Sequence, residues 1–374
     1  MDRDRLWGKK MTKIEQVAEL GQAIWLDYID RSLFVSGELQ RLIEDGIRGV
    51  TSNPTIFQRA ISDSPDYVDE LTEATRLSST AEDTYELIVV DDICSALDVL
   101  YPVYQETEGL DGYVSLEVDP SLANDTERTV AEAKRLFEQI DRPNLLIKVP
   151  ATPPGIPAIE QLISEGINVN VTLIFSQDHY KAAARAYIRG LERRVERGED
   201  IAGLASVASL FISRMDTAVD AMLEDKGETD LQGKIGIANA KLVYQHFLDI
   251  FDGERWEALA AQGARVQRPL WASTSTKNPA YPDTMYVERL IGPHTVNTMP
   301  PRTLEAFRDH GMVAATVRNG LHMAKDHLAR LDALGIDIDA VAEKLQEEGV
   351  KKFVDSFEGL LETIEEERKK LARS

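Results

Sequence analysis

The segment NLLIKVPATPPG (residues 144–155) has a lysine at the centre of an apolar run. Four apolar residues surround Lys148, and Pro150 ends the run. A short apolar segment bounded by Asn and Pro is typical of a strand that is buried on both faces of a parallel sheet. An ammonium group is rarely buried unless another group pairs with it or it loses its charge. The segment therefore predicts a buried parallel strand and raises the question of what Lys148 does there.

Seven other segments also read as strands, and helical stretches separate them. The eight predicted strands are residues 23–29, 48–54, 112–118, 144–150, 168–175, 203–211, 268–274 and 295–300. Eight strands that alternate with helices over 374 residues are typical of a (β/α)8 barrel. A doubly wound open sheet is the alternative, but neither nucleotide-binding glycine motif occurs. We therefore expect an α/β fold, a (β/α)8 TIM barrel.

No linker or change of composition marks a second domain, so we expect one domain over residues 1–374, with residues 1–11 an extended or disordered N-terminus.

Helical stretches include 126–140, 178–196 and 235–251, and Asn53, Asp125 and Ser176 are predicted helix caps. Two additions are a helical insertion at about 57–108 and a C-terminal helix. The latter has four apolar residues on one face, which predicts that it packs on the barrel: Phe353, Phe357, Leu360 and Ile364. A homodimer seam is the alternative.

Charge and composition exclude several classes of partner. The net charge of −22 argues against nucleic acid and anionic membranes as partners, and a phosphorylated substrate would need a local cluster of Arg or Lys. The single cysteine, Cys94, excludes an internal disulfide, and we expect a buried, inert thiol. The longest uncharged run, 201–213, is too short to span a bilayer as a helix, and we find no secretory signal. We expect a cytoplasmic protein.

Polar residues recur on the strand faces that would point into the barrel. Alternate residues of a strand share a face, and active sites of such barrels lie where the strands end. The predicted inward or strand-end set is Asp27, Thr51, Asn53, Ser115, Glu117, Lys148, Asn168, Asn170 and Thr172. Each has a structural alternative. Lys148 and Glu117 could form only a salt bridge, Asn53 could only cap a helix, and the residues of the fifth strand could satisfy one another.

One lysine with two carboxylates matches a particular chemistry. An apolar environment disfavours the ammonium form, and the free amine attacks a carbonyl to give a protonated Schiff base. That iminium accepts the electrons of a breaking carbon–carbon bond, while carboxylates serve as base and as acid for water. A metal-dependent aldolase would need clustered histidines, whereas the six here fall mainly in helical, solvated stretches. We therefore expect a Schiff-base aldolase with no metal and no cofactor.

The sequence resembles the transaldolase family from about Met11 onward. The matching motifs are WLDYI, GVTSNPTIF, SLEVDP, LIKVPAT, GINVNVTLIFS, SLFISRMD and IGIANAKLVYQ, and the segment LWASTSTKNP is similar to the longer bacterial form. The resemblance implies transfer of a dihydroxyacetone unit between sugar phosphates in the pentose phosphate pathway. Sedoheptulose 7-phosphate and glyceraldehyde 3-phosphate would give erythrose 4-phosphate and fructose 6-phosphate.

The resemblance also implies roles for individual residues. Lys148 would form the Schiff base, Asp27 would deprotonate the C4 hydroxyl, and Glu117 with Thr172 would handle the catalytic water. The residues that would hold the dihydroxyacetone part or line its pocket are Thr51, Asn53, Asn170, Ser209 and Phe211.

The phosphate site is defined less fully by the resemblance. Arg214 matches the family's phosphate-binding arginine, and a guanidinium can donate two parallel hydrogen bonds to phosphate. Where shorter enzymes have an arginine, this chain has Lys277 in a segment two residues longer. Lys277 with Ser273 or Ser275 is one solution, and another basic residue is the alternative.

Two other functions stay open at this point. One is an aldolase on the same scaffold, like fructose 6-phosphate aldolase, that cleaves or joins without transfer. The other is a catalytically silent barrel that acts as a binding protein.

Overall fold

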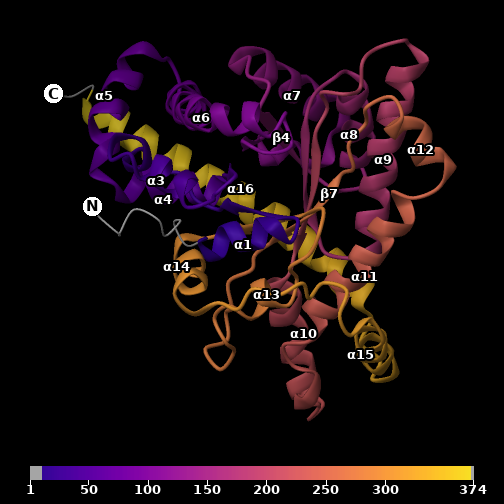
Figure 1. Ribbon diagram of the computed structural model, residues 1–374. Helices are drawn as coiled ribbons and strands as arrows, with labels where there is room; N and C mark the ends of the chain where they lie inside the picture. Colours follow the sequence, from indigo (N-terminus) through magenta and orange to yellow (C-terminus); the bar gives the residue numbers. More distant parts are fainter. Residues whose placement is uncertain (1–10, 372–374) are drawn as a thin grey trace, which may run out of the picture.

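The computed structural model describes residues 11–371, and its sheet is a closed barrel of eight parallel strands in chain order (Figure 1). The predicted N-terminal extension, apart from Met11, lies outside the described residues. All eight predicted strands are confirmed, each somewhat shorter than predicted. They are β1 (Gln22–Leu26), β2 (Gly49–Thr51), β3 (Tyr113–Glu117), β4 (Leu145–Pro150), β5 (Val169–Ile174), β6 (Ser206–Phe211), β7 (Arg268–Ala272) and β8 (Thr295–Met299). The predicted (β/α)8 barrel is therefore confirmed.

Helices surround the barrel, and the predicted insertion forms α4, α5 and α6. The helices up to β5 are α1 (Lys13–Glu19), α2 (Ser32–Val35), α3 (Glu38–Glu44), α4 (Pro54–Asp63), α5 (Val68–Leu77), α6 (Ala81–Glu106), α7 (Thr126–Ile140) and α8 (Gly155–Ser164). Those after β5 are α9 (Gln177–Glu196), α10 (Ser213–Asp225), α11 (Ile235–Ile250), α12 (Glu254–Ala260), α13 (Met285–Glu288), α14 (Pro301–His310), α15 (Leu321–Ala333) and α16 (Ile338–Leu371). Short 3-10 turns lie at η2 (Pro65–Tyr67), η3 (Pro120–Asn124) and η4 (Thr229–Leu231).

The three predicted helix caps are confirmed. The side chains of Asn53, Asp125 and Ser176 each accept a hydrogen bond from the backbone amide three residues later. Such a bond satisfies an amide that the helix itself leaves without a partner. The cap at Asn53 also fixes the point at which the chain leaves β2 and enters α4.

Strand alternation separates two apolar layers. Residues such as Leu116, Ile147 and Val149 are buried between the strands and the helices. Trp25 and Leu146 belong instead to a second buried cluster inside the barrel. The predicted orientation of strands three and four is therefore confirmed, and it leaves the inner positions nearest the carboxyl ends to polar residues.

Strand β5 departs from the predicted alternation at Leu173. Its pairing with β6 shifts register between Val171 and Ile174, and Leu173 has a φ of +55°. Alternation predicts that Leu173, next to the inward Thr172, points toward the helices. That prediction is wrong, because the bulge turns Leu173 away from the helix layer and its side chain packs under α16. A Cβ on Gly349 of α16 would lie only 2.8 Å from Leu173 Cδ2, which explains the glycine there.

Asn168 was predicted to point inward with Asn170, but it precedes β5 and does not reach the carboxyl-end site. Its amide donates to the carbonyls of Pro143 and Leu145, and its Oδ1 accepts from the Ala205 amide. Asn168 thus links the start of β4 to the segment before β6, at the amino ends of the strands.

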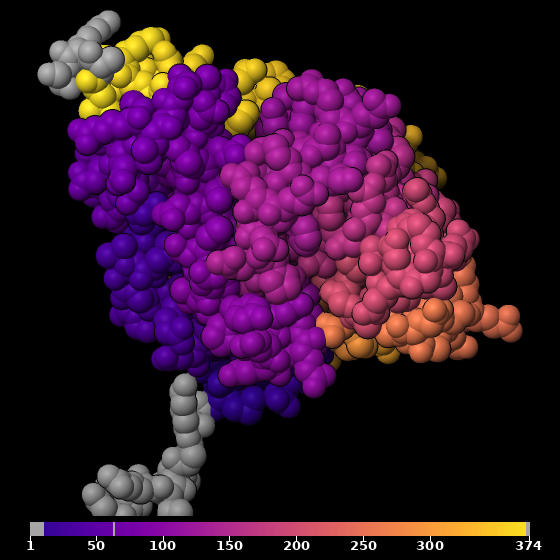
Figure 2. All heavy atoms as spheres, turned by 90° about the horizontal axis from the view of Figure 1, so that it is seen from above, coloured from indigo at the N-terminus to yellow at the C-terminus, as the bar shows by residue number. Residues whose placement is uncertain are grey.

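The C-terminal helix α16 packs on the barrel, as predicted. It runs along α4 and α6, appears in yellow beside the purple insertion, and reaches β5 (Figures 1 and 2). Phe353, Leu360 and Ile364 are buried, and Phe357 is partly buried. Gln346 donates to the carbonyls of Ala151 and Leu173, so the helix is hydrogen-bonded to the ends of β4 and β5.

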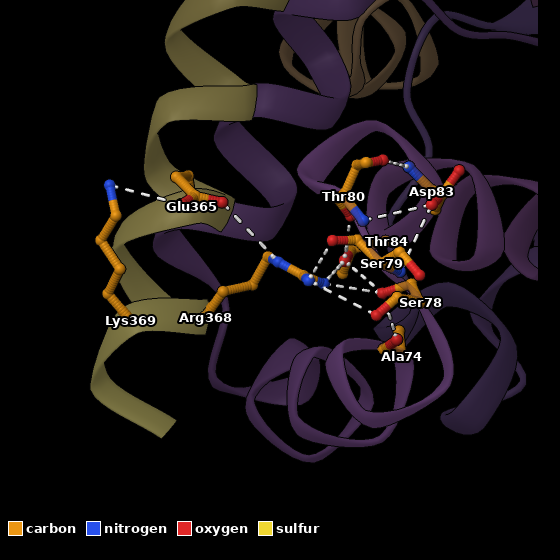
Figure 3. Close-up of polar contacts among 9 residues, drawn as sticks. All are labelled: Ala74, Ser78, Ser79, Thr80, Asp83, Thr84, Glu365, Arg368 and Lys369. Atoms are coloured by element: carbon orange, nitrogen blue, oxygen red, sulfur yellow. Dashed lines mark hydrogen bonds and ion pairs between the residues drawn. The ribbon is translucent and has the colours of Figure 1, made fainter. Parts of the chain in front are cut away.

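Arg368 fastens the far end of α16 to the turn between α5 and α6 (Figure 3). Its Nη1 donates to Ser78 Oγ at 2.8 Å and to Thr84 Oγ1 at 2.6 Å, and its Nη2 donates to the Ser79 carbonyl at 2.8 Å. A planar guanidinium presents these donors from two separate nitrogens in a fixed fork, whereas a lysine has a single nitrogen at its end. The insertion and the C-terminal helix are thereby joined.

Two predictions about single side chains need correction. His179 was expected to be solvated, but it is buried where α16 covers the start of α9, with Nε2 3.0 Å from Glu343 Oε1. Cys94 is only partly buried, and burial raises the pKa of its thiol, which opposes reactivity.

Among the helices of residues 11–371, none combines the length and the apolar character that a membrane span requires.

Candidate active site

The pairing register of β3, β4 and β5 sets three polar residues directly beside one another on neighbouring strands. Glu117 of β3 pairs with Lys148 of β4, and Lys148 pairs with Asn170 of β5. Lys148 is 5% exposed, and its Nζ lies 3.1 Å from Glu117 Oε2 and 2.8 Å from the Ser52 carbonyl. The lysine therefore reaches the inside of the barrel with a carboxylate and a carbonyl as partners, as a buried ammonium requires.

A cavity of about 530 Å³ opens above Lys148 at the carboxyl ends of the strands. It brings together every residue to which the resemblance gave a role except Glu117, whereas Ser115 and Asn168 of the predicted inward set do not line it. These lining residues are Asp27, Thr51, Asn53, Lys148, Asn170, Thr172, Ser209, Phe211, Arg214, Ser273 and Lys277. Residues from most of the eight strands thus converge on one space large enough for a sugar phosphate.

Glu117 lies behind Lys148 and does not line the main cavity. Its side chain is 5% exposed and borders a smaller cavity of about 150 Å³ together with Tyr85 of α6 and Phe357 of α16. Burial raises the pKa of Glu117, and the charge of Lys148 opposes that rise. A carboxyl group with a raised pKa next to an amine is suited to exchange protons with it.

Asp27 follows β1, which lies two strands from the β3 strand of Glu117, and it lines the main cavity. Thr51 Oγ1 donates to Asp27 Oδ1 at 2.7 Å. Burial raises the pKa of Asp27, while the Thr51 hydrogen bond and the charge of Lys148 act in the opposite direction. The second carboxylate is therefore separate from Glu117 and has a different set of partners.

Amide and hydroxyl groups of β3, β5 and β6 form a hydrogen-bonded chain inside the barrel. Ser209 Oγ donates to Asn170 Oδ1 at 2.7 Å, and Asn170 Nδ2 donates to Ser115 Oγ at 3.0 Å. Thr172 Oγ1 is buried and has no hydrogen-bond partner among the described residues. A buried hydroxyl without a protein partner is suited to bind water or a substrate hydroxyl.

The outer part of the cavity is lined by cations. Arg214 and Lys277 occur there, together with three residues that the sequence analysis missed: Arg59, Arg302 and Lys352. Burial lowers the pKa of Lys277, and the charges of Arg214, Lys352 and Arg59 lower it further. Cations that repel one another in a partly closed cavity attract an anion such as phosphate.

The three missed residues lie on helices, with Arg302 on α14 directly after β8. Arg59 lies on α4 and Lys352 on α16, so both reach the cavity only because these helices pack together. Phe353 of α16 also lines the cavity, and its ring centroid lies 5.9 Å from Lys148 Nζ. The apolar face of α16 was visible in the sequence, but its position over the barrel mouth was not.

Serine and aromatic side chains complete the walls. Ser273 has a φ of +56° and its Oγ lies 2.9 Å from Ser213 Oγ, while Lys277 donates to Ser275 at 2.7 Å. The Arg214 guanidinium lies 5.2 Å from the ring centroid of Phe211. No group of three or more His, Cys, Asp or Glu side chains within residues 11–371 is placed to hold a metal ion.

A family model described as transaldolase/fructose-6-phosphate aldolase matches residues 24–364. The chain belongs to this family. It is 48% identical to a transaldolase of Trichodesmium erythraeum, with 95% of this chain and 97% of the relative covered. It is 50% identical to a transaldolase of Thiobacillus denitrificans, with 95% and 100% covered, and 48% identical to one of Thermobifida fusca, with 94% and 97% covered. The predicted resemblance to transaldolases is therefore confirmed.

The hydrogen bond from Thr51 predicts a shift in the titration of this transaldolase-family protein. In Thr51→Val the bond that favours the charged form of Asp27 is lost, so the pKa of Asp27 should rise further above its ordinary value. Carboxyl ¹³C NMR would measure this pKa, with Asp27→Asn to assign the signal.

Thr298→Val is the matched control, because Thr298 Oγ1 lies 2.7 Å from Thr51 Oγ1 and leaves the bond to Asp27 in place. An unchanged or lowered Asp27 pKa in Thr51→Val, or an equal rise in Thr298→Val, would contradict the assignment.

Proposed function

We propose that this protein catalyses the transaldolase reaction, the transfer of a dihydroxyacetone unit from sedoheptulose 7-phosphate to glyceraldehyde 3-phosphate. The products are erythrose 4-phosphate and fructose 6-phosphate, and the reaction is reversible. The relatives named transaldolase, matched over nearly their whole length, support this reaction. The observation that carries the proposal is a buried lysine, paired with one carboxylate, in a cavity that holds a second carboxylate and an outer cluster of cations.

In the proposed mechanism, the free amine of Lys148 attacks the C2 carbonyl of the ketose. Glu117, 3.1 Å from Nζ, is placed to take a proton from the amine and return one to the departing hydroxyl. Water then leaves, and a protonated Schiff base forms between Lys148 and C2. Thr172, whose hydroxyl has no partner among the described residues, is placed to hold this water.

Asp27 takes the proton of the C4 hydroxyl, and the bond between C3 and C4 breaks. Its electron pair moves to the iminium and gives an enamine on Lys148, while C4 leaves as the carbonyl of the product aldose. The enamine then attacks the carbonyl of the acceptor, and hydrolysis returns the amine. Asn53, Asn170 and Ser209 are placed to hold the hydroxyls of the three-carbon unit.

We further propose that Arg214 and Lys277 share the phosphate with residues outside the family motifs. Lys352 of α16 lines the same cavity, and burial together with the charges of Arg214 and Arg59 lowers its pKa. The sequence left open whether Lys277 or another basic residue makes the second contact, and we propose that Lys277 and Lys352 both do. A phosphate bound there would offset the repulsion among these cations.

The proposed reaction predicts dependence on an acceptor aldose. With fructose 6-phosphate and erythrose 4-phosphate, the protein should release glyceraldehyde 3-phosphate, which a coupled dehydrogenase would measure. Without erythrose 4-phosphate the release should be far slower, because the enamine waits for an acceptor. Equal rates with and without the acceptor would favour the aldolase alternative, and no release in either case would favour the silent barrel.

Two neighbouring lysines of α16 test the phosphate assignment. Lys352→Met should raise KM for fructose 6-phosphate about tenfold or more with little change in kcat, since a charge-assisted hydrogen bond contributes about 1.5–3 kcal/mol. Lys351→Met is the control, because Lys351 is exposed and pairs with Asp355 at 2.7 Å.

Unphosphorylated fructose provides the second control for Lys352. The variant should use it as well as the unaltered protein does. An equal effect of Lys352→Met on both sugars, or an effect of the same size in Lys351→Met, would contradict a phosphate contact.

A further inference from the structure

A second cavity, of about 310 Å³, lies between α11, α13 and α15 on the outside of the barrel. Helices α11 and α15 lie side by side, at the lower right of Figure 1. The cavity shares no lining residue with the catalytic cavity. Its lining contains no carboxylate, although the chain as a whole has a net charge of −22. Four of its residues carry or can carry a positive charge: Lys234, Lys241, Arg289 and His327.

These positive charges are not neutralised by ion pairs. No hydrogen bond or ion pair involves the side chains of Lys234 and Arg289 within residues 11–371. Burial lowers the pKa of Lys241, and the charge of Arg289 lowers it further. In the same way, burial and then the charge of Lys234 lower the pKa of His327. The groups are therefore close enough to repel one another.

One of the cations that line the cavity, Lys241, is almost completely buried. It is 9% exposed, and its Nζ donates to the carbonyls of Thr316 at 3.0 Å and Asn319 at 2.5 Å. An ammonium has three donors, so one remains for a ligand. The two bonds also hold the segment that leads into α15.

Helix α15 begins at this cavity with Gly320, whose φ is +68°. It has no capping side chain and no acidic residue in its first turn. The first amides of such a helix attract anions. The start of α11 differs, since Asp216 Oδ1 already accepts from the Gly236 amide at 2.6 Å.

One side of the cavity is apolar. Ile237, Met285 and Met323 line it, and Met323 is 52% exposed. Half-exposed methionine is adaptable and packs well on apolar or aromatic groups. The cavity thus combines cationic groups with an apolar wall.

We propose that this cavity binds a small organic anion. Its phosphate or carboxylate oxygens would contact Arg289, Lys234 and the first amides of α15, and its apolar part would cover Met323 and Met285. The site is separate from the catalytic one. It suits an anion with an apolar group rather than a sugar phosphate, because the hydroxyls of a sugar would find few partners on the methionine side chains.

Phenyl phosphate is the probe, and calorimetric titration measures its binding. Because the catalytic cations also attract phosphate, the reference is the full chain with Arg214→Gln and Lys352→Met. We expect this variant to bind phenyl phosphate, and we expect the addition of Arg289→Gln and Lys234→Gln to raise Kd about tenfold or more. Arg289→Gln with Lys234→Gln alone should keep the sugar-phosphate turnover of the unaltered protein, which controls for folding.

Two further titrations define the ligand. The Kd of benzoate, compared with that of phenyl phosphate, shows whether the site prefers a carboxylate or a phosphate. A preference for one of the two anions is expected of a specific site. Inorganic phosphate should bind more weakly than phenyl phosphate, because it has no apolar part. Undetectable binding of phenyl phosphate to the reference variant, an unchanged Kd after removal of Arg289 and Lys234, or equal binding of inorganic phosphate would overturn the proposal.

Discussion

The ion pair between Lys148 and Glu117 is the interaction on which the barrel mouth depends. Both side chains are nearly inaccessible, and a buried charge left without its partner typically costs about 3–5 kcal/mol. The pair exists because β3 and β4 meet in the register that sets these residues level, and the Ser52 carbonyl supplies a further bond. A slip of one residue would turn Lys148 toward the helices. Strand register therefore determines whether a lysine reaches the inside of the barrel at all.

The cavity has two electrostatically different ends. At the inner end, charges are balanced, since Lys148 faces Glu117 and Asp27 accepts a bond from Thr51. At the outer end, the charges of Arg214 on α10 and Arg59 on α4 add to burial in lowering the pKa of Lys277 and of Lys352. An anionic substrate would therefore be oriented with its phosphate outward and its carbonyl toward the lysine. Helix α16 is central to this arrangement because it supplies both Lys352 and the Phe353 ring near Lys148.

Much of this could be predicted because strand signals are local. Apolar runs and alternation with period two predicted the eight strands and the inward position of Lys148, while the phosphate-site residues Arg214, Ser273 and Lys277 came from the resemblance to the family. Of the residues to which the resemblance gave a role, all but Glu117 share one cavity. Alternation failed at Leu173, where a bulge depends on the neighbouring strand and on α16. Arg59 and Lys352 could not be predicted, because nearly 300 residues separate them in sequence and only the packing of α4 on α16 brings them together. Their local sequence is that of ordinary helical surface residues.

The most direct test of the central claim is a borohydride trap. The protein would be incubated with fructose 6-phosphate, reduced, digested and analysed by mass spectrometry. We expect a three-carbon adduct on the peptide that contains Lys148, since reduction fixes the Schiff base left after cleavage. An unmodified Lys148 in folded protein that turns the substrate over would contradict the account, because the buried lysine would then be structural and another group would act as the nucleophile.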